Sequence, residues 1–110
     1  MNAQAQLAQL QELSPEAELW TEGGQPVAFL PAVRFAAGGS RIVRDLLLWP
    51  RERDGYATRL FVSEPVNAGK GQNWKAFSLF GRTWHACSWQ GVPGTLPWIE
   101  ILANHLRAFR

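Results

Sequence analysis

The 110 residues match the length of one ordinary domain, and the formal net charge is +2 at neutral pH. Charged residues make up 18% of the chain, and six Trp and six Phe supply bulky apolar area, which excludes an intrinsically disordered protein. The lone cysteine excludes an internal disulfide and argues against a secreted, disulfide-built scaffold. We therefore expect a single folded domain over residues 1–110.

The location of the protein is predicted to be cytoplasmic. The first thirty residues lack the basic, apolar and small-residue regions of a signal peptide. No run approaches the roughly 20 apolar residues of a membrane span, so we expect no membrane partner. The cations are nine Arg and two Lys, and Arg suits fixed contacts with carboxylates, phosphates or a partner surface. Solvated strand faces and helix ends are the simpler interpretation of these cations.

The chain is predicted to begin with a short amphipathic helix over residues 1–13. Its apolar positions share one face: Leu7, Leu10 and Leu13. The following Ser14-Pro15-Glu16 combines an N-cap residue, a first-turn proline and an acid, which predicts one further helical turn before Trp20. Gly-Gly at positions 23–24 then breaks the pattern.

Three strands are predicted in the first half of the sequence. Apolar residues alternate over 27–35, and Pro31 makes this strand either an edge strand or a bulged one. A second strand covers 41–49, and its end is apolar on both faces, so it should lie centrally in the sheet. A charged hairpin loop separates it from a third strand over 58–62.

After a long loop, two further strands are predicted over residues 74–80 and 83–89, and a helix is predicted from position 98. The helix has the clearest pattern, with apolar residues on one face at Trp98, Ile101, Leu102, Leu106 and Phe109. Thr95 is the expected cap, Pro97 lies in the first turn, and Arg107 and Arg110 suit the negative C-terminal end. We therefore predict an α+β fold: an N-terminal helix, an antiparallel meander of four or five strands, and a C-terminal helix, with both helices on one face.

Cys87 is the residue most suited to chemistry. Free cysteines are often buried and inert, and spacing alone favours that interpretation. If residues 83–89 are extended, however, His85 and Cys87 point to the same face. An adjacent imidazole can take the proton of a thiol, and the thiolate is the reactive form. His105, near the edge of the helical apolar stripe, is interpreted as structural.

Other kinds of site have little support in the sequence. One Cys and two His cannot supply the four ligands of a structural zinc site, so we expect no metal. The Gly-containing loop at 67–71 matches no phosphate-binding fingerprint, so we expect no nucleotide cofactor. Asp45 and Glu100 do not form a catalytic carboxylate pair. Arg and Trp side chains can stack on single-stranded nucleic acid, but most Trp positions are needed for the core, so we expect no nucleic-acid partner.

The C-terminal part of the sequence resembles the compact prokaryotic ubiquitin-conjugating-like proteins. The resemblance covers most of the chain from about Leu19 and is specific in the last thirty residues, in Phe80-Gly81-Arg82-Thr83-Trp84, Ser88-Trp89, Leu96-Pro97-Trp98 and Leu102-Ala103-Asn104-His105-Leu106-Arg107. Members are encoded beside ubiquitin-like proteins, activating enzymes and JAB-type deconjugating proteases, and some of these operons act in bacterial antiphage defence. The resemblance implies these proteins as pathway partners and the ubiquitin-conjugating-enzyme (UBC) fold.

The resemblance also implies a mechanism. Cys87 would accept the C-terminus of a ubiquitin-like protein as a thioester from an activating enzyme and pass it to a target. Asn73, the auxiliary His85 and backbone N–H groups near Ser88 would be the candidates for stabilising the oxyanion. The exposed Arg side chains and the 67–71 loop would contact the partner.

Typical members carry a His-Pro-Asn triplet several residues before the cysteine and long C-terminal helices. Neither feature is present here. Two alternatives therefore remain. The chain is either a minimal conjugating enzyme with rearranged auxiliary groups or a catalytically inactive relative that binds the activating enzyme or the ubiquitin-like protein.

Overall fold

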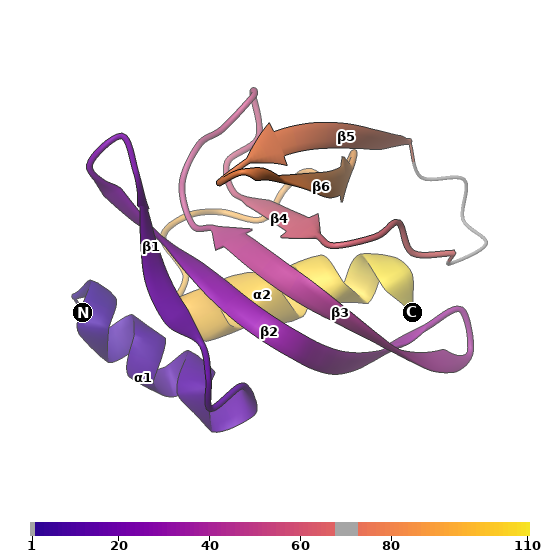
Figure 1. Cartoon of the computed structure of the whole chain (residues 1–110), viewed down its shortest axis with the longest axis horizontal. Helices are drawn as coiled ribbons and strands as arrows, with labels where there is room; N and C mark the ends of the chain where they lie inside the picture. The colour runs from indigo at the N-terminus through magenta and orange to yellow at the C-terminus, as the bar shows by residue number, and fades with distance from the viewer. Residues whose placement is uncertain (1, 68–72) are drawn as a thin grey trace.

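The computed structural model describes residues 2–67 and 73–110 and has the α+β architecture that the sequence predicts. An N-terminal helix precedes a six-stranded antiparallel sheet, and a second helix follows it (Figure 1). The elements are α1 (Ala3–Leu13), β1 (Glu18–Glu22), β2 (Gln25–Ala37), β3 (Ser40–Trp49), β4 (Arg59–Val62), β5 (Trp74–Leu79), β6 (Arg82–Cys87), α2 (Trp98–Leu106) and the 3-10 turn η1 (Arg107–Phe109).

The strands lie in the order β1-β2-β3-β4-β6-β5, and all neighbours are antiparallel. The first four strands form a meander, in which β2, β3 and β4 were predicted and β1 was not. The hairpin of β5 and β6 then joins the sheet through its second strand, so that β6 lies between β4 and β5. The strand that carries Cys87 is therefore an inner strand, and β5 is the edge.

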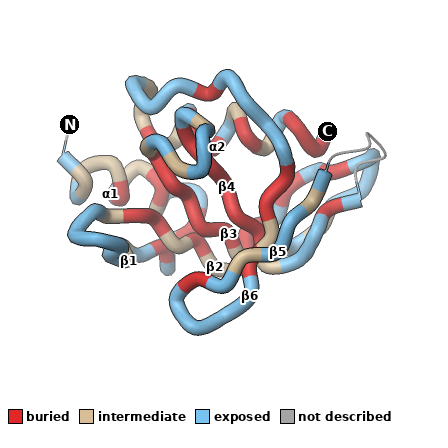
Figure 2. The backbone as a smooth tube through the Cα atoms, turned by 90° about the horizontal axis from the view of Figure 1, so that it is seen from above, coloured by how far each residue is buried: buried red, intermediate tan, exposed pale blue. Residues whose placement is uncertain are grey.

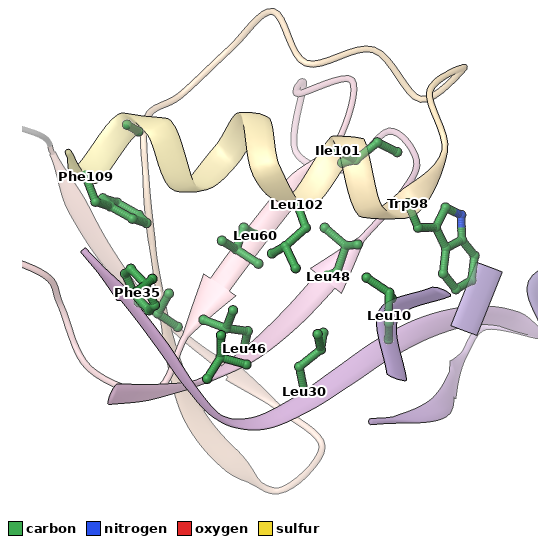
Figure 3. Packing of buried hydrophobic residues seen from close by; sticks show 14 of the residues in the cluster. Leu10, Leu30, Phe35, Leu46, Leu48, Leu60, Trp98, Ile101, Leu102 and Phe109 are labelled. Atoms are coloured by element: carbon green, nitrogen blue, oxygen red, sulfur yellow. The ribbon is translucent and has the colours of Figure 1, made fainter. Parts of the chain in front are cut away.

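Both helices pack on one face of the sheet, as expected (Figures 1 and 3). Leu10 of α1 and Ile101 and Leu102 of α2 are almost completely buried against the sheet. They belong to one cluster with apolar side chains of the central strands, among them Leu30, Leu46, Leu48 and Leu60 (Figure 3). Figure 2 shows the same division, with buried backbone along the central strands and exposed backbone at the hairpins.

The opposite face of the sheet forms a second core, although no helix within residues 2–67 and 73–110 covers it. Val27, Leu47, Phe61 and Trp84 are fully buried there. Trp20 on the edge strand β1 lies 6.5 Å from the Trp84 ring on β6, although three strands separate β1 from β6 in the sheet. The sheet must therefore curl around this second core, which brings β1 and β6 together. We call it the aromatic core; its buried members are Val27, Leu47, Trp49, Phe61, Leu79, Trp84 and Ala86.

The turn between β5 and β6 completes the aromatic core. Phe80 and Gly81 both have positive φ, 52° and 75°, which fits a two-residue hairpin turn of the primed type. This conformation is ordinary for glycine and unfavourable for a bulky residue such as Phe80. The Phe80 ring lies 5.0 Å from Trp20 and 6.5 Å from Trp49, so aromatic contacts offset the strain.

Several local predictions were wrong or incomplete. Ser14-Pro15-Glu16 starts no helical turn, because Ser14 is the C-cap of α1 and the unpredicted strand β1 begins at Glu18. Leu13 is 49% exposed, so only Leu7 and Leu10 of the predicted leucines are buried. Thr95 does not cap α2, because Pro97 occupies the cap position. The Trp98 N–H in the first turn donates instead to the Gln6 side chain of α1 at 2.9 Å.

The prediction that Pro31 lies on an edge strand or in a bulge is confirmed through its second alternative. Strand β2 is not an edge strand, since it pairs with both β1 and β3. It does carry a bulge, with a register shift between Leu30 and Val33. The backbone N–H of Ala32, inside the bulge, donates to the Asp45 carboxylate at 2.8 Å, so the bulge has its own hydrogen-bond partner. Asp45 therefore has a structural role.

Candidate functional site

Cys87 is the last residue of β6, and its side chain faces the helix-covered core. Its cross-strand partner is Trp74, the first residue of β5, whose ring stacks on Phe109 at 5.7 Å. Cys87 is 8% exposed. The thiol is therefore close to the surface but largely covered by apolar neighbours.

His85 and Asn73 lie beside Cys87 at the same end of the β5–β6 ladder. Side chains alternate along β6, with Trp84 and Ala86 in the aromatic core, so His85 shares the Cys87 face, as predicted. Asn73 directly precedes the Cys87 partner Trp74, and its carbonyl accepts a bond of 3.2 Å from the Ser88 N–H. The backbones of the three residues that the sequence singles out therefore lie at one end of this ladder, with His85 on the Cys87 face.

The hydrogen bonds at this end decide which groups can serve as oxyanion donors. The Ser88 N–H is already used by the Asn73 carbonyl, so it is not available to an oxyanion. The Ser88 hydroxyl accepts from the Tyr56 hydroxyl at 3.2 Å. Within residues 2–67 and 73–110, neither the Asn73 amide nor the His85 ring forms a side-chain hydrogen bond, so both remain available.

Burial governs the electrostatics of Cys87. Removal from water raises the pKa of the Cys87 thiol, while a backbone hydrogen bond and the positive charge of Arg59 offset part of this effect. The thiol is therefore protonated at neutral pH in this conformation. Nucleophilic chemistry at Cys87 requires a base and a more open surrounding.

A buried network that the sequence did not reveal links the segment after Cys87 to α2. The Thr58 hydroxyl donates to the Val92 carbonyl at 2.8 Å, and it lies 2.8 Å from His105 Nε2. The hydroxyl has only one proton, so His105 Nε2–H must be the donor to Thr58. His105 is 4% exposed, and the structure supports its interpretation as a structural residue.

The comparisons with known proteins give no relative. No known protein family matches the chain, and neither a curated protein nor a solved structure matches it. The residues themselves are therefore the basis for any functional proposal.

Two other features bear on the sequence predictions. Among the described residues, no group of three or more His, Cys, Asp or Glu side chains is arranged to hold a metal ion. No helix in this part of the chain is long and apolar enough to cross a membrane. Most of the loop predicted to contact a partner, 67–71, lies outside the described residues.

Proposed function

We propose that this chain acts in a ubiquitin-like conjugation pathway and accepts the C-terminus of a ubiquitin-like protein as a thioester on Cys87. The proposed setting is a bacterial antiphage defence system, with an activating enzyme and a JAB-type deconjugating protease as further partners. The observation that carries the proposal is the position of Cys87, His85 and Asn73 along the backbone at one end of the β5–β6 ladder. The order of elements adds support, since Cys87 ends the sheet just before the chain crosses to α2.

The proposed reaction exchanges one thioester for another. The sulfur of Cys87 attacks the carbonyl carbon that is bound to the cysteine of the activating enzyme. A new S–C bond forms on Cys87, and the S–C bond to the activating enzyme breaks. The Cys87 proton passes through His85 to the departing thiolate, and the Asn73 amide donates to the oxyanion of the tetrahedral intermediate.

Burial sets a condition on this mechanism. A thiol that is 8% exposed and has a raised pKa cannot attack a bulky carbonyl centre without local rearrangement. Docking of the activating enzyme must therefore uncover Cys87. The segment over residues 88–97, which contains no helix or strand, is the part of the chain next to Cys87 that is best suited to move.

The test is an assay for a thiol-labile adduct. The protein is incubated with its activating enzyme, its ubiquitin-like protein and ATP, and the products are separated with and without reductant. We expect an adduct that reductant removes and that Cys87→Ala abolishes. Asn73→Ala should slow its formation about 100-fold, because it removes one oxyanion donor. With a partner set that is demonstrably active, absence of any adduct would exclude the proposal.

A second candidate function, a catalytically inactive adaptor of the same pathway, is favoured by the burial and the raised pKa of Cys87. In that case Cys87→Ala retains full binding to the activating enzyme or the ubiquitin-like protein. The rate of alkylation by iodoacetamide at pH 7 separates the two candidates. An adaptor thiol stays protected after the partner is added, whereas the conjugating function requires alkylation to accelerate when the activating enzyme binds.

A further inference from the structure

A pocket lies on the other face of the sheet from Cys87, beside the aromatic core. It has a volume of about 270 Å³ and is lined by Asp54, Tyr56, Arg59, Lys75 and Phe77. Lys75 pairs across the ladder with Ala86, and the Tyr56 hydroxyl bonds to Ser88, so the pocket is at the same end of the sheet as Cys87. The proposed thioester chemistry makes no use of it.

Arg59 is the central group of this pocket, and it is held rigidly. Its side chain is only 6% exposed, although it carries a full positive charge. The guanidinium lies 4.1 Å from the Tyr56 ring centroid and 5.0 Å from that of Phe77, so cation–π contacts fix its plane. Asp54 accepts a hydrogen bond from Nη1 at 3.0 Å. The guanidinium is thus preorganised in one orientation.

The hydrogen-bonding capacity of Arg59 is mostly unused. A guanidinium has five N–H donors, and burial without partners is costly. Nε is buried and has no partner, and within the described residues the bond from Nη1 to Asp54 is the one hydrogen bond that the guanidinium makes. Such a group, at the wall of a pocket, favours an anionic ligand that accepts from the remaining N–H groups of the guanidinium.

The charges around the pocket indicate the net charge of the ligand. Arg53, Arg59 and Lys75 contribute three positive charges. Asp54 lies 3.3 Å from Arg53 and 3.0 Å from Arg59, and Glu22 lies 3.8 Å from Arg53, so two carboxylates offset them. One positive charge remains, which a monoanion neutralises and a dianion overcompensates.

We propose that this pocket binds a carboxylate group, carried by a small organic acid or by an acidic side chain of a partner. A carboxylate is planar and singly charged, so it matches both the guanidinium fork and the residual charge. The Tyr56 and Phe77 rings favour an apolar body next to the carboxylate. The inference is independent of the thioester proposal.

The test is a titration of the whole protein with sodium benzoate at pH 7 and constant ionic strength, followed by proton–nitrogen NMR. We expect saturable shifts of the Arg59 Nε–H and Lys75 backbone signals, with a dissociation constant on the order of millimolar. Neutral benzamide should cause none of these shifts. Equal binding of benzamide, tighter binding of inorganic phosphate, or absence of saturation would each overturn the inference.

Substitutions of pocket residues test whether benzoate binds in this pocket. Arg59→Lys should weaken benzoate binding about tenfold, because the charge stays and the fork is lost. Lys75→Gln, at an exposed position that tolerates substitution, should weaken it about threefold and serves as the second readout if Arg59→Lys does not fold. Arg41→Gln, which removes an exposed cation elsewhere, should leave binding unchanged; an equal loss there would show a general charge effect and overturn the inference.

Two further arms identify the source of the carboxylate. An acetylated and amidated Gly-Glu-Gly peptide that binds more tightly than benzoate assigns the pocket to an acidic side chain, and the reverse order assigns it to a free acid. Cys87→Ala should bind benzoate as the wild type does. A failure of the thioester assay therefore leaves the carboxylate inference standing, and the reverse also holds.

Discussion

Replacing Trp84 with alanine is expected to lower the free energy of unfolding by about 3–5 kcal/mol. Trp84 is fully buried, and its ring contacts Trp20 and Phe29 from the other side of the curled sheet. The Arg82 guanidinium also lies 4.3 Å from the Trp84 ring. Both α1 and α2 lie on the other face and cannot collapse into the space, so the cavity would persist.

Urea denaturation of the variant and two matched controls measures this effect. Trp89→Ala removes an indole that is 38% exposed and should change the unfolding free energy by no more than about 0.5 kcal/mol. Trp84→Phe keeps an aromatic ring and removes the buried indole N–H, which has no partner, so it should cost about 1–2 kcal/mol. A cost for Trp84→Ala no larger than that for Trp89→Ala would contradict a core on this face.

Lowering the pH from 7 to 4 is expected to remove about 3 kcal/mol of stability through His105 alone, at about 1.36 kcal/mol for each unit of pKa difference. Burial, aided by the positive charge of Arg59, lowers the pKa of His105 to about 4, from 6.5 in the unfolded chain. Between these two values the unfolded state binds more protons than the folded state. The contribution is therefore complete above pH 6.5 and is lost as the pH falls from 6.5 towards 4.

Comparison of the wild type with His105→Gln isolates this contribution. Glutamine keeps an N–H donor for Thr58 and does not titrate, while the carboxylates that also respond to acid are common to both proteins. The difference in unfolding free energy, wild type minus variant, should decrease steadily from pH 7 to pH 4.5. A difference that stays constant over this range would show that His105 titrates at its ordinary pH.

Short-range patterns explain which elements the sequence could predict. The apolar stripe from Trp98 to Phe109 and the alternation over 27–35 each lie within one element, and both elements are present. Strand β1 was missed because its five residues are mostly half-buried or exposed and show no apolar alternation. The position of β6 between β4 and β5 depends on pairing between distant segments, which no local pattern contains.

In the candidate site, too, only the features that depend on neighbouring residues could be predicted. His85 and Cys87 are two residues apart on one strand, so they were expected on one face, and they lie on one face. The burial of Cys87 depends on side chains from other elements, and so its raised pKa could not be read from the sequence. The bond between Thr58 and His105 joins residues 47 positions apart, and the aromatic enclosure of Arg59 likewise comes from separate elements.

The contact between Trp20 and Trp84 has a consequence for the folding pathway. It joins β1, the first strand in the chain, to β6, the last one, so a long segment must be closed before it can form. We therefore expect closure of the aromatic core to follow the rate-limiting transition state for folding. Weakening this contact should accelerate unfolding more than it slows folding. The curl of the sheet is therefore expected to set the unfolding rate of the protein.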